Sequence, residues 1–231
     1  MKHTVKNGFH THPVRINLIG VGGGGSLVLS GLVRLHLAMK SLGHPYGLDV
    51  EVWDPDRVSS ANIGRQLFAA SEIGLNKAEA LVNRYNLGFA LNWKAHPERY
   101  HSNRGFDVLI ACVDSRRSRK EIFQTLPKKN GPYVLDGGVL ATCGQVIIGN
   151  GSKELPYPYQ ELPTLINTRI KEKNLPSCSL AESLSIQELF VNQWLAELEL
   201  IWRLFRKGGL DYRGFYINLD TGRMNPVPIG E

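Results

Sequence analysis

"GVGGGGS" occupies residues 20–26, directly after the apolar run "VRINLI" at residues 14–19. The run has the length of a buried strand, and a long apolar segment typical of a helix follows the serine. Glycine loses more conformational freedom on folding than any other residue, so four in a row need a reason. Gly20, Gly22 and Gly25 fit the spacing G-x-G-x-x-G, which lets a backbone turn approach phosphate groups at a helix N-terminus.

Strands and helices are expected to alternate after this turn. The expected elements are a helix at 26–43, a strand at 48–53, a helix at 71–85 with Ser71 as its N-cap, an apolar strand at 106–113, a basic helix, and strands at 132–139 and 144–149. Alternation of this kind, to about residue 126, predicts an α/β fold with a Rossmann-like, doubly wound, mostly parallel sheet and helices on both faces.

The C-terminal part has three expected segments. Residues 150–180 are rich in Pro, Lys and Asn and predict a loop or crossover. Residues 181–206 carry the strongest helix pattern, and its apolar stripe is interpreted as core packing. The last twenty residues predict a short β-hairpin around "DTG". With a core at about 14–145, these segments predict one domain over residues 1–231.

Composition excludes several classes of protein. The net charge of +6 comes without a wide basic surface, so no nucleic-acid partner is expected, and "DSRRSRKE" at 114–121 is interpreted as a solvated helix face. No apolar run is long enough to span a membrane, and the N-terminus lacks the apolar segment of a signal peptide. The three cysteines form no CxxC pair, which predicts neither a disulfide framework nor structural zinc. A cytoplasmic protein is therefore expected.

Four segments in order carry a family resemblance. They are the glycine loop at 20–26, "DPDRVSSANIGRQ" at 54–66, "GLNKA" at 74–78 and the apolar strand "LIACVD" that ends at Asp114. The set resembles the E1-like activating enzymes, the family of ThiF, MoeB and the ubiquitin E1 proteins, over roughly residues 14–145. The segments "PSCSLAE" and "YRGFYINLDT" are most similar to ThiF-like proteins of the PRTRC group.

The resemblance implies an adenylating enzyme. It would use ATP and Mg²⁺ to activate the C-terminal glycine of a small ubiquitin-like or sulfur-carrier protein. Attack on the α-phosphate spreads negative charge over phosphate oxygens, which calls for cations and a metal rather than a strong base. A homodimer is also implied, because the family commonly dimerises through this domain.

The resemblance also implies roles for single residues. Arg65 and Lys77 would bind the triphosphate, and Asp114 would hold Mg²⁺. The implied nucleotide-binding set is Gly20, Gly22, Gly23, Gly25, Asp54, Asp56, Asn62, Arg65, Gln66 and Lys77. Asp54 would accept hydrogen bonds from the ribose hydroxyls. Taken singly, the cations could be ordinary surface residues, Asp114 could cap a helix, and Asp56 could merely form the turn after Pro55.

Cys178 is a candidate nucleophile. Its segment "LPSCSLAES" looks like the P-x-C-T-L segment around the nucleophile of ubiquitin-type E1 proteins, with Ser179 in place of Thr. A cysteine near a helix N-terminus can have a lowered pKa, which favours the reactive thiolate. A small buried residue is the alternative interpretation. Cys112, in an apolar strand, is interpreted as core, and Cys143 is undecided, with a structural role favoured.

The chain departs from the family in three ways. It has no "R-Y-x-R-Q" segment, so an arginine supplied across a subunit interface is in doubt, and Arg15 is a poor substitute. It lacks the CxxC motifs that hold zinc in MoeB and ThiF, and it has no room for a large cysteine domain. Adenylation of a non-protein substrate, an NAD-dependent oxidoreductase and a non-catalytic scaffold stay open as alternatives. The oxidoreductase would explain the glycine loop and Asp54 but neither "NIGRQ" nor "LNKAEA".

Overall fold

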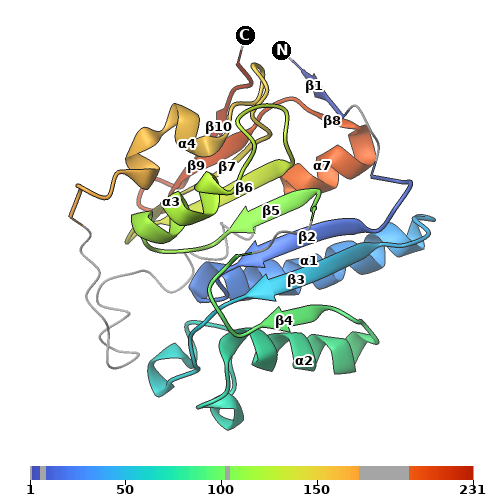
Figure 1. Ribbon diagram of the computed structural model, residues 1–231, viewed down its shortest axis with the longest axis vertical. Helices are drawn as coiled ribbons and strands as arrows, with labels where there is room; N and C mark the ends of the chain where they lie inside the picture. Colours follow the sequence, from blue (N-terminus) through green and yellow to red (C-terminus); the bar gives the residue numbers. More distant parts are fainter. Residues whose placement is uncertain (1, 6–8, 102–104, 172–197, 231) are drawn as a thin grey trace.

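The computed structural model describes residues 2–5, 9–101, 105–171 and 198–230 (Figure 1). Its elements in chain order are β1 (His3–Thr4), β2 (Val14–Ile19), α1 (Gly23–Ser41), β3 (Leu48–Trp53), η1 (Ser60–Asn62), η2 (Ala70–Glu72), α2 (Lys77–Phe89), β4 (Lys94–His96), β5 (Val108–Ala111), α3 (Arg116–Gln124), β6 (Tyr133–Val139), β7 (Cys143–Gly149), α4 (Pro158–Glu161), η3 (Pro163–Ile166), α7 (Glu199–Lys207), β8 (Gly209–Leu210), β9 (Gly214–Asn218) and β10 (Arg223–Val227).

An eight-stranded sheet organises the fold, with strand order β10-β9-β7-β6-β5-β2-β3-β4. The central strand β2 pairs in parallel with β3 on one side and with β5 on the other. Parallel pairing continues to β4 and β6, whereas β7, β9 and β10 add to the sheet antiparallel. Figure 1 shows β4 and α2 at one end of this sheet and β9 and β10 at the other. The predicted α/β sheet is confirmed.

Helices cover both faces of the sheet. The larger buried cluster holds residues of α1, α2 and α7, such as Val28, Leu81 and Leu204. The smaller cluster lies on the other face and holds Ile122 and Phe123 of α3. Strands buried on both faces need near-continuous apolar sequence, which is why the runs at β2, β3 and β5 could be recognised in the sequence. No helix in the described ranges is long and apolar enough to cross a membrane.

The first half of the chain contains the expected elements with α2 displaced, and it adds β1 and β4, which were not expected. Strands were expected at 14–19 and 48–53 and occur there, and the first helix starts at Gly23 rather than at residue 26. The expected helix at 71–85 with Ser71 as N-cap is wrong. Gly74 has a φ of +91°, which no continuous helix allows, and α2 begins at Lys77. The side chain of Asn76 caps it by accepting from the N–H of Glu79.

The second half adds elements that the sequence did not predict. The expected strand at 106–113 spans only Val108–Ala111, and the expected loop at 150–180 contains α4 and η3. The predicted hairpin is confirmed as β9 and β10. Of the helix expected at 181–206, residues 181–197 lie outside the described part. In the described part, Leu198, Ile201 and Phe205 are buried, so the core-packing interpretation is confirmed there.

Two glycines of the quoted stretch are required by the protein's own backbone. Gly20 has a φ of +84°, and a Cβ there would lie 2.8 Å from the carbonyl oxygen of Cys112. A Cβ on Gly25 would lie 1.9 Å from the carbonyl oxygen of Gly20. The first turn of α1 therefore packs directly on the carbonyl group that follows β2, and no side chain fits between them.

We expect Gly25→Ala to lower the free energy of unfolding by about 2 kcal/mol or more, because the added methyl group meets backbone that cannot rotate away. Gly88→Ala in α2 is the matched control. No described atom lies within 4 Å of its built Cβ, so this variant should be unchanged or more stable by about 0.5–1 kcal/mol. Urea denaturation of both variants checks the pair, and equal unfolding midpoints would contradict the close packing.

Candidate functional site

The cleft of interest lies at the carboxyl ends of the parallel strands. From β2 the chain builds β3 and β4 on one side and then returns to build β5 and β6 on the other. Such a reversal leaves a crevice outside the strand ends, where ligands of doubly wound sheets bind. The cleft here has a volume of about 1640 Å³. Small-molecule sites occupy roughly 300–1,000 Å³, so this cleft has room for more than one reactant.

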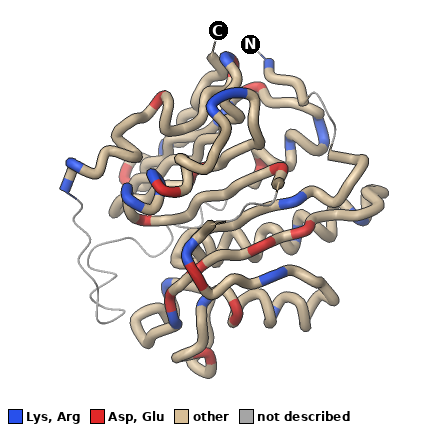
Figure 2. Tube along the Cα trace, in the orientation of Figure 1, with Lys and Arg blue, Asp and Glu red and all other residues tan. Residues whose placement is uncertain are grey.

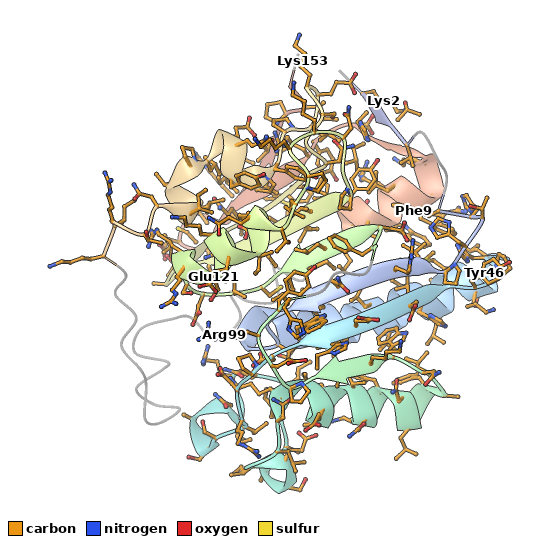
Figure 3. All side chains as sticks on the ribbon, in the orientation of Figure 1. Lys2, Phe9, Tyr46, Arg99, Glu121 and Lys153 are labelled. Atoms are coloured by element: carbon orange, nitrogen blue, oxygen red, sulfur yellow. The ribbon has the colours of Figure 1, made fainter. Side chains whose placement is uncertain are left out.

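The structure brings most of the residues expected to form the site to this one cleft. Those that line it are Gly20, Gly22, Gly23, Asp54, Asp56, Asn62, Arg65, Gln66, Lys77 and Asp114. Gly25 does not line it, and its packing on Gly20 replaces the expected approach to phosphate at that position. Cys178 lies outside the described residues. Glu121 of α3 and Arg99 after β4, both labelled in Figure 3, also line this cleft.

The N-terminus of α1 faces the cleft without a side-chain cap. Gly22 is the N-cap residue, and the first turn of α1 contains no acidic side chain. The nearest described atom to a Cβ built on Gly22 is Nε2 of Gln66, at 4.0 Å, so nothing in the described fold fills this space. The first N–H groups of a helix have no partner within the helix and carry partial positive charge. This end of α1 is suited to an anion.

Asp54 ties the glycine turn to the end of β3. Its side chain is buried, and one carboxylate oxygen accepts from the N–H of Val21 at 2.7 Å while the other accepts from the N–H of Asp56 at 2.9 Å. Burial raises the pKa of the Asp54 carboxyl, and the two N–H donors and the Lys77 ammonium oppose that shift. Asp54 thus holds the turn in shape whether or not it also contacts a ribose.

Lys77 is positioned by its neighbour Asn76, which the sequence analysis missed. The Asn76 side-chain amide donates to the carbonyl oxygens of Asp54 at 2.8 Å and Asp56 at 3.0 Å. This fixes the start of α2 against the "DPD" turn and points Lys77 at the cleft, where its Nζ lies 3.3 Å from Oδ2 of Asp56. The signal was available, since Asn followed three residues later by Glu is a helix-start pattern.

The excursion between β3 and α2 supplies the other polar groups. Asn62 accepts from the N–H of Ser59 at 2.9 Å, which shapes the turn η1. Gln66 is buried, and its Oε1 has no hydrogen-bond partner among the described residues. Burial lowers the pKa of the Arg65 guanidinium. A buried acceptor without a partner and a desolvated cation both fit a ligand that carries donor groups and negative charge.

Asp114 is exposed in the segment between β5 and α3 and lines the cleft. Ser115, not Asp114, caps α3, because its Oγ accepts from the N–H of Ser118 at 3.0 Å. The helix-cap alternative for Asp114 is therefore wrong. The described residues contain no group of three or more His, Cys, Asp or Glu side chains able to hold a metal by themselves. A single carboxylate still fits Mg²⁺ that arrives on a polyphosphate, because Mg²⁺ is often held by one or two carboxylates and the substrate.

Two cysteines also line the cleft. Cys112 lies just after β5 rather than inside it, and burial raises the pKa of its thiol to about 12, with the Asp136 carboxylate adding to the shift. At neutral pH it is a protonated thiol and a poor nucleophile. Cys143 is the first residue of β7 and is partly buried beside the cleft.

A buried ion pair beside the cleft was not predicted. Arg119 of α3 donates from Nε to Oδ1 of Asp136 at 2.9 Å, and Asp136 is completely buried on β6. The sequence held a partial signal, because Arg119 shares a helix face with Ile122 and Phe123 and therefore faces the core. Its acidic partner came from another part of the chain. Figure 2 shows charged residues of both signs around α3.

Comparisons with known proteins agree with this architecture. The sequence model of the ThiF family matches residues 10–229. The crystal structure of E. coli MccB with ATP has a TM-score of 0.62 and 16% identity, and the match covers 94% of this chain and 64% of that chain. MccB with MccA has a TM-score of 0.63 and 15% identity, over the same shares of the two chains. The structure of PaaA has a TM-score of 0.60 and 16% identity, again over 94% and 64%.

These structural matches show the fold alone, because sequence identities of 15–16% are too low to carry a function across. The present chain spans about 64% of the length of the MccB and PaaA chains. None of the curated proteins matches this sequence.

We expect Asn76→Ala to lower the free energy of unfolding by about 2 kcal/mol, because it removes a helix cap and leaves the carbonyl of Asp54 without its donor, while the carbonyl of Asp56 keeps the N–H of Lys77. Ser71→Ala is the control. The exposed Ser71 lies in η2 and caps no α-helix, so this change should stay within about 0.5 kcal/mol of the parent. Thermal unfolding of both variants decides between the two positions. A larger loss of stability from Ser71→Ala than from Asn76→Ala would mean that the helix begins after Ser71, which would contradict the structure.

Proposed function

Because the chain belongs to the ThiF family, we propose that it is an adenylating enzyme that binds Mg-ATP in this cleft and activates the carboxylate of a peptide or small protein. The observation that carries the proposal is the convergence of the uncapped end of α1 with Arg65, Lys77 and Asp114 on one cleft larger than a single nucleotide needs. The E. coli relative MccB, which shares the fold, was crystallised with ATP.

Each group in the cleft has a place in this reaction. A carboxylate oxygen of the substrate attacks the α-phosphorus of ATP, and the bond from the α-phosphorus to the oxygen that bridges to the β-phosphorus breaks. Pyrophosphate departs, and an acyl-adenylate is formed. The N–H groups of α1, Arg65 and Lys77 would bind the phosphates, and fixed positive charge stabilises the charge that develops there. Asp54 would accept from the ribose, with Asp56, Asn62 and Gln66 as further polar contacts. Asp114 would hold Mg²⁺, which neutralises phosphate charge when bound.

The substrate is proposed to enter over β6 and β7. Uncharged residues line much of that part of the cleft, among them Gly138, Cys143, Gln145 and Tyr216, and the guanidinium of Arg119 lies beside Gly138. A cleft wall with two adjacent glycines, Gly137 and Gly138, suits an extended chain end with small side chains, such as the C-terminal glycine of a ubiquitin-like or sulfur-carrier protein. MccB was crystallised with the MccA peptide, which supports a peptide or protein substrate over a small molecule.

Two finer steps complete the proposal. The acyl group would pass to Cys178, with a new bond from Sγ to the carbonyl carbon and AMP as the leaving group. We also propose a homodimer. Three large apolar side chains are exposed on the excursion before α2, namely Leu67 by 37%, Ile73 by 50% and Leu75 by 51%, and burial of such surface favours association.

We expect Mg-ATP to bind the full chain in titration calorimetry and Lys77→Gln to weaken that binding at least tenfold, because the variant removes a nearly buried cation from the cleft. Lys94→Gln is the matched control, since Lys94 pairs with Glu51 outside the cleft and its loss should leave the affinity unchanged. The same titration with NAD tests the oxidoreductase alternative. Binding of NAD without binding of Mg-ATP would overturn the proposed function.

We expect ATP–pyrophosphate exchange to require a substrate with a free carboxylate. Synthetic peptides that end in Gly-Gly should support exchange, and the same peptides with an amidated C-terminus should not, because a neutral carboxamide has no carboxylate to attack the α-phosphorus. Cys178→Ala should keep the exchange and lose any thiol-sensitive adduct with the peptide. Exchange that proceeds equally with amidated peptides would contradict carboxylate activation, and a thiol-sensitive adduct on the Cys178→Ala protein would exclude Cys178 as the site of the thioester.

A further inference from the structure

The pair formed by Arg119 and Asp136 is an unusual element beneath the cleft. Both side chains are buried, Arg119 with 9% and Asp136 with 0% of the side chain exposed. Oδ2 of Asp136 has no hydrogen-bond partner among the described residues. Removing two charges from water is costly, and well-packed apolar residues often stabilise a fold as much as a buried ion pair or more. The pair is therefore poorly explained by stability alone.

The remaining contacts of Arg119 point to the cleft. Its Nη2 donates to the carbonyl oxygen of Gly137 at 3.1 Å, and its Nη1 donates to the carbonyl oxygen of Asp114 at 3.4 Å. The guanidinium thus joins Asp114, in the segment between β5 and α3, to Gly137 in the second half of β6. Asp114 and Gly137 both line the cleft. Only the planar, multidentate donor of arginine can reach these three acceptors at once.

Asp136 keeps the guanidinium in place. Its carboxylate lies on β6 one residue before Gly137, in a strand whose register with β5 sets Ala111 opposite Asp136. The sheet therefore determines where Asp136 lies, Asp136 determines where Arg119 lies, and Arg119 contacts the backbone of Asp114. Asp114 itself is exposed, and no hydrogen bond of its side chain to a described residue competes with a ligand.

We infer that Arg119 and Asp136 are positioning residues that fix the backbone of Asp114 so that its carboxylate meets the Mg²⁺ of bound Mg-ATP. The inference rests on the proposed function, in which Asp114 is the metal-holding residue. It assigns to the pair a role in metal affinity and not in nucleotide affinity as such. Residues that orient a metal ligand typically contribute 10–100-fold to metal binding.

The test separates positioning from stability. Arg119→Met alone leaves a buried carboxylate without its partner and is expected to destabilise the protein. The double variant Arg119→Met, Asp136→Leu removes both charges, so the net charge near the cleft is unchanged and the core regains apolar contacts. We expect the double variant to unfold at or above the temperature of the parent. Arg119→Lys is the second variant, because it keeps a cation beside Asp136 but cannot span all three acceptors.

Two affinities are measured for each protein, one for ATP in EDTA and one for ATP with saturating Mg²⁺. The parent should bind ATP more tightly with Mg²⁺. In the double variant and in Arg119→Lys we expect the increase in ATP affinity caused by Mg²⁺ to be about tenfold smaller than in the parent. The affinity for ATP in EDTA should be the same as in the parent. Asp114→Ala should show the same loss. Arg117→Met is the control, because Arg117 lies on the same helix beside the cleft but pairs with Glu121 at its surface.

The outcomes distinguish the two levels of the argument. A parent protein that binds no ATP under either condition overturns the proposed function. A second outcome overturns the positioning role alone. In it, Mg²⁺ raises the ATP affinity of the parent, Asp114→Ala abolishes this gain, and both Arg119 variants keep it in full. Equal loss of affinity in EDTA and in Mg²⁺ would also overturn it, since a general distortion of the cleft would then explain the data.

Discussion

The close approach of α1 to the backbone after β2 is the constraint on which the rest of the site depends. A side chain at Gly25 would collide with the carbonyl group of Gly20, and Gly20 itself adopts a left-handed conformation. This contact sets the start of α1 at the end of β2. The N–H groups of Gly20 and Val21 then bond to the carbonyl of Trp53 and the carboxylate of Asp54, which locks the turn to β3. Two of the glycines, Gly20 and Gly25, are thus required by close packing of the backbone, whereas Gly22 borders the open cleft.

Charge in the cleft is held at a cost to stability. Burial raises the pKa of both Asp54 and Asp136. A carboxyl whose pKa is raised by folding favours the folded state below its ordinary pKa, and this contribution is lost as the pH rises through the raised value. At neutral pH both groups therefore oppose folding when ionised. The neighbouring cations reduce that cost, Lys77 for Asp54 and Arg119 for Asp136. Both cations also line the cleft.

How much the sequence could predict depended on the range of the interactions involved. The strands at 14–19 and 48–53 were recognisable because a strand buried on both faces needs an unbroken apolar run. The cleft residues were predictable because their segments match a family pattern in order. The start of α2 was missed because a local pair, Gly74 and Asn76, outweighed the apolar periodicity. The Arg119–Asp136 pair, and the joining of β1 to β8, depend on residues distant in sequence that only the folded chain brings together.

The antiparallel half of the sheet has a consequence for how the protein is made. β7 is hydrogen-bonded to β6 on one edge and to β9 on the other, and β9 lies far later in the chain. While the ribosome is still producing the intervening residues, the outer edge of β7 displays unpaired backbone groups beside the apolar side chains of Val146 and Ile148. An open edge of this kind can pair with the wrong strand or with another nascent chain. Synthesis of β9 therefore covers the open edge of β7 and also adds Tyr216 to the wall of the cleft.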